Sequence, residues 1–181
     1  MKVMLKVTLV VMLLVALPSG FGAQAAAGSP DHAGQVTAHS LLFKGTLEGR
    51  HASRVPVNPP VVFDRFETEG EGTQLGHFEL VIEATVDFGS RPVTGAGTYT
   101  FTAANGDRLV AHHTGFSALV QPGTVLITEH AIVDAERSTG RFAGAEGTFT
   151  IERLADAATG VGGLTVGTFD GTLTLPRPAG A

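Results

Sequence analysis

The chain has 181 residues, of which 17 are acidic and 12 are basic, so its formal charge is −5 with histidine neutral. This negative balance argues against the phosphate backbone of a nucleic acid as a partner. The chain contains no cysteine, which excludes a disulfide framework and a lipidated cysteine anchor. Its length suits one domain, and we expect that domain to fold without a structural metal.

The N-terminal segment has the three parts of a secretory signal. Lys2 and Lys6 precede an apolar run at residues 7–17, which is followed by Pro18 and by the small residues at 23–25. A basic start, a short apolar middle and an A-x-A exit are typical of a cleavable signal peptide. The apolar run is much shorter than the roughly 20 residues of a membrane-spanning helix. We therefore expect a signal peptide at 1–25, a secreted or periplasmic location and no membrane span.

Residues 26–38 are small and polar and predict a flexible lead-in to a folded domain at 39–176, with a short tail at 177–181. Within the domain the clearest pattern is that of 77–88, where Phe78, Leu80 and Ile82 alternate with mostly polar residues. Period two is the spacing of a half-buried strand. Similar runs lie at 40–51, 64–75, 97–103, 107–116, 124–135, 147–154 and 164–175.

Short turns separate these eight runs, among them Asn105-Gly106 and Gln121-Pro122-Gly123. Connections of this length favour an up-and-down order of antiparallel strands. Eight such strands close most simply into a barrel, since closure leaves no exposed sheet edge. The sequence therefore predicts an all-β, single eight-stranded antiparallel up-and-down β-barrel, with an open β-sandwich as the alternative.

Three segments carry a resemblance to a known family. The sequence STGRFAGAEGTF at 138–149 resembles a turn and strand of the allene oxide cyclase and dirigent-like barrels. Segments 72–78 and 102–109 are similar to elements of exported bacterial proteins of that type. The resemblance implies a largely apolar barrel interior that confines a small guest, as in cyclases of oxygenated fatty acids or proteins that direct phenol coupling. It also implies association into homo-oligomers, but its motifs assign no catalytic residue here.

The Asn105-Gly106 pair predicts a two-residue type I′ hairpin turn, which sets the register of its strands. In that register Tyr99 lies opposite His112, and opposed residues share a face. We expect both side chains inside the barrel, where a phenol and an imidazole hydrogen-bond to each other or to a ligand. The alternative is a structural polar pair at the barrel mouth.

Glu129 is a carboxylate on the more apolar face of its predicted strand. It shares that face with Val125, Ile127, Ala131 and Val133. If this face points inward, desolvation raises the pKa of Glu129 and makes it a general acid or base near neutral pH. If the strand is reversed, Glu129 lies in solvent.

The seven histidines do not have the spacing of a metal site. His112 and His113 are adjacent on a strand and must point to opposite faces, and there is no H-E-x-x-H motif. Phosphate-binding loops, dinucleotide fingerprints and nucleophile elbows are absent from the sequence as well. We expect neither a metal nor a cofactor.

These patterns predict a secreted barrel that binds a small, largely apolar molecule. Cyclase or isomerase activity would use Glu129, His112 and Tyr99, and the ligand would contact walls formed by Phe78, Ile82, Phe101 and Phe149. The alternative is a non-catalytic exported barrel whose interior is packed shut and which serves envelope or protein interactions. Eleven phenylalanines could suffice to fill an eight-stranded interior.

Overall fold

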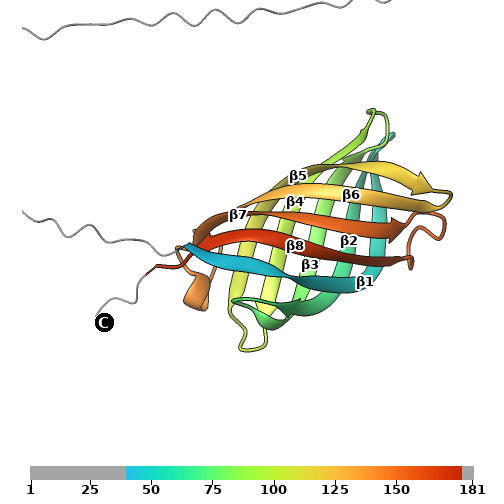
Figure 1. The fold of residues 1–181 in the computed structure, drawn as a ribbon. Helices are drawn as coiled ribbons and strands as arrows, with labels where there is room; N and C mark the ends of the chain where they lie inside the picture. The colour runs from blue at the N-terminus through green and yellow to red at the C-terminus, as the bar shows by residue number, and fades with distance from the viewer. Residues whose placement is uncertain (1–39, 177–181) are drawn as a thin grey trace, which may run out of the picture. The chain divides into compact units, whose positions relative to one another are not determined.

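The computed structural model describes residues 40–176, which form a closed barrel of eight antiparallel strands (Figure 1). Each strand pairs with the next along the chain, and β8 pairs with β1. This confirms the predicted up-and-down barrel and excludes the sandwich. The strands are β1 (Ser40–Asn58), β2 (Val61–Gly72), β3 (Gly76–Asp87), β4 (Val93–Ala103), β5 (Arg108–Gln121), β6 (Thr124–Val133), β7 (Glu146–Asp156) and β8 (Leu164–Thr174).

The predicted signal peptide at 1–25, the lead-in at 26–38 and the tail at 177–181 lie outside the described residues. One 3-10 turn, η1 (Gly140–Phe142), interrupts the strands between β6 and β7. In the part of the chain that the structure covers, no helix has the length and apolar character needed to cross a membrane.

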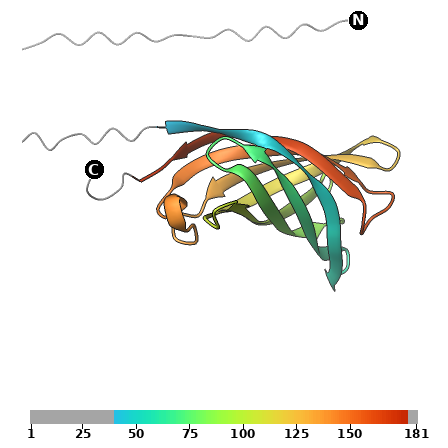
Figure 2. The ribbon, with the colours of Figure 1, turned by 90° about the horizontal axis from the view of Figure 1, so that it is seen from below.

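The barrel has two ends with different contents. At the terminal end, β1 begins beside the end of β8, and Ser40 pairs with Thr174 (Figure 1). The distal end carries the turns that join β1 to β2, β3 to β4, β5 to β6 and β7 to β8. Strand β1 bends strongly along its length (Figures 1 and 2), and its pairing with β2 shifts register between His51 and Ser53. A bulge of this kind bends the strand that contains it.

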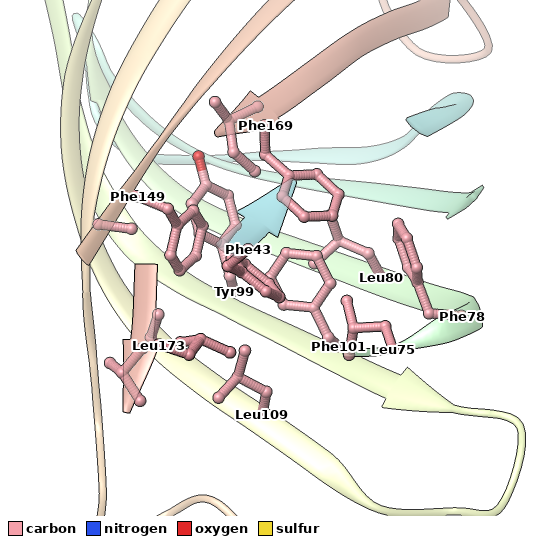
Figure 3. Packing of buried hydrophobic residues seen from close by; sticks show 14 of the residues in the cluster. Phe43, Leu75, Phe78, Leu80, Tyr99, Phe101, Leu109, Phe149, Phe169 and Leu173 are labelled. Carbon is pink, nitrogen blue, oxygen red and sulfur yellow. The ribbon is translucent and has the colours of Figure 1, made fainter. Parts of the chain in front are cut away.

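An aromatic cluster fills the terminal half of the barrel (Figure 3). The ring of Phe43 lies edge-on to Phe101 at a centroid distance of 5.7 Å and to Phe149 at 5.0 Å. Such edge-to-face packing is the favoured geometry of aromatic pairs. Every ring of the cluster is at most 3% exposed. The cluster consists of Phe43, Phe78, Tyr99, Phe101, Phe149 and Phe169.

The four residues predicted to form ligand walls are therefore part of the packed core. Phe78, Ile82, Phe101 and Phe149 are between 0% and 3% exposed and pack against other core side chains. The prediction that they line a cavity is wrong, because an eight-stranded interior is narrow enough for rings from opposite strands to meet.

A pair of glycines makes room for the ring of Phe169. Gly45 on β1 lies opposite Gly72 on β2. A Cβ atom at Gly45 would lie 2.6 Å from Cζ of Phe169, and one at Gly72 would lie 2.7 Å from the same atom. Both distances are far below van der Waals contact, so the ring can reach the barrel wall only where both side chains are missing.

The hairpin between β4 and β5 corrects the predicted register by one residue. The amide of Ala103 donates to the carbonyl of Asp107 at 2.9 Å, and the amide of Gly106 donates to the carbonyl of Ala103 at 2.8 Å. Gly106 has a φ of +86°, so the loop has three residues and ends on a left-handed glycine. Tyr99 consequently lies opposite Ala111. The predicted type I′ turn is wrong because Ala104 belongs to the loop.

The aromatic cluster should dominate stability. Replacing Phe101 with Ala removes a ring that is 0% exposed and should lower the free energy of unfolding by about 3–5 kcal/mol. Urea denaturation followed by circular dichroism measures this change. Ile132→Ala is the control, because Ile132 is 66% exposed and its loss should change the free energy by about 0.5 kcal/mol or less. Equal effects of the two substitutions would contradict a core at Phe101.

Candidate ligand-binding site

The distal half of the barrel contains a cavity of about 170 Å³. Its lining includes Phe66, Val86 and Ile127 from the inner face of the strands, together with charged side chains. Phe88 also lines it and remains 39% exposed. Phe88 marks the mouth, so the cavity communicates with solvent at the distal end. An apolar cavity with a few convergent polar groups is the usual form of a small-molecule site.

Glu129 and Arg153 form a buried ion pair at this cavity. Nε of Arg153 donates to Oε2 of Glu129 at 2.9 Å, and Nη2 donates to Oε1 at 3.2 Å. Gly115 lies opposite Glu129 on β5, where a Cβ atom would come within 2.7 Å of Cγ of Glu129. The glycine thus provides the space for this carboxylate. The sequence left open whether Glu129 points into the barrel or into solvent. In the structure it points inward and is 4% exposed.

The ion pair outweighs the effect of burial on the pKa of Glu129. Burial by itself raises the pKa of Glu129, but the positive charge and hydrogen bonds of Arg153 outweigh it, so the pKa is lowered from its ordinary value of 4.5. Burial also disfavours the charged form of Arg153, yet the charge of Glu129 keeps the pKa of that guanidinium raised. The expectation of a raised pKa at Glu129 is therefore wrong, because Arg153 on the neighbouring strand stabilises the ionised carboxylate. Glu129 is ionised near neutral pH.

Tyr99 and His113 lie beside this ion pair. Their rings stack at a centroid distance of 4.1 Å with an interplanar angle of 14°. Nε2 of His113 donates to the carbonyl of Glu83 at 3.4 Å, and Nδ1 lies 3.6 Å from Oε1 of Glu129. The Tyr99 hydroxyl and Nδ1 of His113 are buried and have no hydrogen-bond partner among residues 40–176. Both atoms are available to a water molecule or to another polar group.

Both rings are uncharged near neutral pH. Burial lowers the pKa of His113, although the negative charge of Glu129 acts in the opposite direction. Burial, reinforced by the charge of Glu129, raises the pKa of Tyr99 well above its ordinary value. The hydroxyl oxygen of Tyr99, drawn in red, lies at the edge of the aromatic cluster (Figure 3). A polar layer thus separates the aromatic cluster from the cavity.

His112 lies on the outer wall of the barrel. Its side chain is 60% exposed, and its Nε2 lies 3.0 Å from Oδ2 of Asp134. The prediction that His112 accompanies Tyr99 inside the barrel is wrong, because the three-residue loop shifts β5 by one position. His113 takes the inner place instead.

A second ion pair, which the sequence pattern does not predict, lies near the cavity mouth. Nε and Nη2 of Arg54 donate to Oδ1 and Oδ2 of Asp64 at 2.7 and 2.6 Å. Nε2 of His51 lies 3.3 Å from Oδ1 of the same carboxylate. Ala52 has no partner on β2, and this bulge changes which later residues of β1 face inward. The bulge therefore directs Arg54 to Asp64, which is 2% exposed.

A signal for both ion pairs is present in the sequence. Asp64 is two positions from Phe66, and Arg153 is two positions from Ile151, so each charge shares a face with a core residue. A charge on an apolar face of a strand predicts a buried partner, since an unpaired charge there is costly. The identity of the partner depends on which strands become neighbours.

No group of three or more His, Asp or Glu side chains in residues 40–176 is arranged to hold a metal ion. No protein-family model, curated protein or solved structure matches this chain. The relation to allene oxide cyclase and dirigent-like barrels accordingly stays a prediction from the sequence motifs.

The buried ion pair should make stability depend on pH in a defined direction. The folded-state pKa of Glu129 is lowered from 4.5, so its contribution to stability is complete above about pH 4.5 and is lost as the pH falls through the folded-state value. Glu129→Gln should lower the free energy of unfolding by about 3 kcal/mol at pH 7. The difference from the unsubstituted protein should shrink at pH 3, as measured by urea denaturation at both pH values.

Glu152→Gln is the control for this experiment, because Glu152 precedes Arg153 on β7 and is exposed. Its effect should stay within about 0.5 kcal/mol at both pH values. An effect of Glu129→Gln that is the same at pH 3 and pH 7 would contradict an ionised, paired carboxylate.

Proposed function

We propose that the protein binds a small, largely apolar molecule in the distal cavity. The observation that carries this proposal is the contrast between the two halves of one barrel. The terminal half is filled by the aromatic cluster, whereas the distal half retains about 170 Å³ of space that reaches the mouth at Phe88. A structural barrel would gain stability from filling this space, because each unfilled volume forfeits packing contacts.

The cavity volume limits the size of the ligand. A protein cavity of about 150 Å³ lined by apolar side chains is large enough to bind benzene. A volume of about 170 Å³ therefore suits one ring or a short branched chain, and a longer molecule must extend through the mouth. Val86, Val125 and Ile127 supply apolar contacts for the enclosed part.

Binding is better supported than cyclase or isomerase chemistry. Proton transfer needs a group that changes protonation near the working pH. Arg153 keeps Glu129 ionised, and Tyr99 keeps its proton. His113 is the remaining candidate of this layer, but it is not among the residues that line the cavity. We propose a non-catalytic ligand-binding barrel first, with confinement-driven cyclisation or isomerisation as an extension.

Family and location belong to the same proposal. The three sequence motifs support membership of the allene oxide cyclase and dirigent-like barrels, and the N-terminal pattern supports a secreted or periplasmic location. Both agree with a barrel that meets its ligand outside the cytoplasm. Neither identifies the ligand.

The second candidate is an exported barrel whose interior has a purely structural role and whose surface contacts other proteins. The packed terminal half favours it, as do exposed apolar side chains on the outer wall. Ile132 is 66% exposed and Leu42 is 62% exposed. On this view the distal space is a packing defect, and no ligand occupies it.

Native mass spectrometry of the protein purified from its own host tests the proposal. A co-purifying small molecule should be found on the intact protein and lost with Ala155→Leu. Ala155 lines the cavity and is 7% exposed, so three added carbon atoms occupy the space that the ligand needs. We expect at least about a tenfold loss of affinity for the recovered molecule, which corresponds to ~1.4 kcal/mol.

Ala118→Leu is the matched control, because Ala118 is exposed on the outer wall of β5 and receives the same added atoms outside the barrel. The affinity of the Ala118→Leu variant for the recovered molecule should equal that of the unsubstituted protein. A protein that carries no guest and binds none of a panel of apolar, phenolic and fatty-acid probes would favour the structural barrel.

A further inference from the structure

The two guanidinium groups that reach the cavity are already bound to carboxylates of the protein. Arg153 donates to both oxygens of Glu129, and Arg54 donates to both oxygens of Asp64. A two-point contact between guanidinium and carboxylate is the geometry with which arginine usually binds a ligand carboxylate. Asp64 and Glu129 therefore occupy the positions that an anionic ligand would need.

The arrangement at Arg54 is the more informative of the two. Arg54 lies near the mouth and its side chain is 37% exposed, whereas the side chain of Asp64 is 3% exposed. The bulge at Ala52 directs this guanidinium inward, where it would offer a binding site to an entering carboxylate. Asp64 lies opposite Arg54 on the neighbouring strand. Its carboxylate accepts the hydrogen bonds that a ligand carboxylate would otherwise accept.

The aromatic faces that could hold a cationic ligand are also occupied. The guanidinium of Arg153 lies 4.3 Å from the centroid of Phe66, and the ring of His51 stacks on Phe66 at 4.6 Å. At the mouth the guanidinium of Arg54 lies 4.9 Å from the centroid of Phe88. A cation bound by these rings would have to displace a charge that the protein already places there.

From these contacts we infer that the ligand is an uncharged molecule and that Asp64 is the residue that excludes a free carboxylate. The inference rests on the proposed function and names the ligand class of that site. Three carboxylates and two guanidiniums line the cavity, so its acidic groups outnumber its arginines. The third carboxylate, Asp156, accepts hydrogen bonds from Ala158 and Thr159. The net field thus also opposes an anion, and the occupied rings oppose a cation. An apolar body with a hydroxyl, carbonyl or ether group fits both conditions.

Three probes that share one ring system test the charge preference. Naphthylmethanol, naphthoate and naphthylmethylamine are long enough to fill the cavity with one ring and to extend through the mouth. They differ mainly in their charge at pH 7, and their binding is measured by isothermal titration calorimetry. The alcohol should bind at least about tenfold more tightly than either ion, since both arginines are paired with carboxylates and the third carboxylate, Asp156, already accepts hydrogen bonds from its own turn. Naphthoate binding as tightly as the alcohol would overturn the inference and leave the proposed function intact. If none of the three binds, the proposed function fails and the inference with it.

Two reciprocal substitutions test the role of Asp64. Asp64→Asn keeps the shape of the side chain and releases Arg54, so naphthoate should gain at least about tenfold in affinity. Arg54→Gln releases Asp64 instead, so naphthylmethylamine should gain by a similar factor. Arg54 is partly exposed, so this second variant carries the test if Asp64→Asn does not fold.

Asp87→Asn is the control, because Asp87 is at the same end of the barrel, does not line the cavity and changes the formal charge equally. Its effect on naphthoate affinity should stay within about threefold, as expected for a screened charge outside the site. An equal gain of naphthoate affinity in Asp87→Asn and Asp64→Asn would overturn the role of Asp64, as would no gain in either reciprocal variant.

Discussion

An eight-stranded barrel encloses a space about as wide as the side chains that point into it, and the other features of this protein depend on that limit. In the terminal half, six rings from five strands pack against one another, mostly edge to face, and leave no room for a guest. Glycine pairs such as Gly45 and Gly72 let a ring approach the wall. In the distal half the ring of Phe66 is accompanied by smaller apolar side chains and charged groups, and there a cavity remains.

The Glu129–Arg153 pair lies where these two halves meet. Removing two charges from water is expensive, and their mutual attraction offsets the expense only when the geometry is good. Here the guanidinium contacts both carboxylate oxygens and packs over the ring of Phe66. The pair gives the cavity a polar boundary without leaving a free charge. It also explains why a carboxylate in an apolar interior has a lowered rather than a raised pKa.

A single extra residue in β1 determines the chemistry of the mouth. Without the bulge at Ala52, the alternation of β1 would direct Arg54 outward. Asp64 would then be buried among apolar groups without the guanidinium that neutralises it. With the bulge, the two residues form a second pair in which the protein's own carboxylate satisfies its own arginine. The charge selectivity that we propose for the ligand follows from this local irregularity of one strand.

The sequence by itself determined the all-β class, the eight strands and the residues that share a face within each strand. Alternation with period two carries that information, and for this reason Glu129 was correctly grouped with Ala131 and Val133. Alternation within one strand gives no information about register, that is, about which residues of the neighbouring strands lie beside it. Only the tertiary structure decided that His113 rather than His112 stacks on Tyr99, that Arg153 pairs with Glu129, and that Phe101 meets other rings instead of a ligand. A loop longer by one residue, or a bulge of one residue, moves every later side chain of the strand to the other face, and both become visible only in the pairing of neighbouring strands.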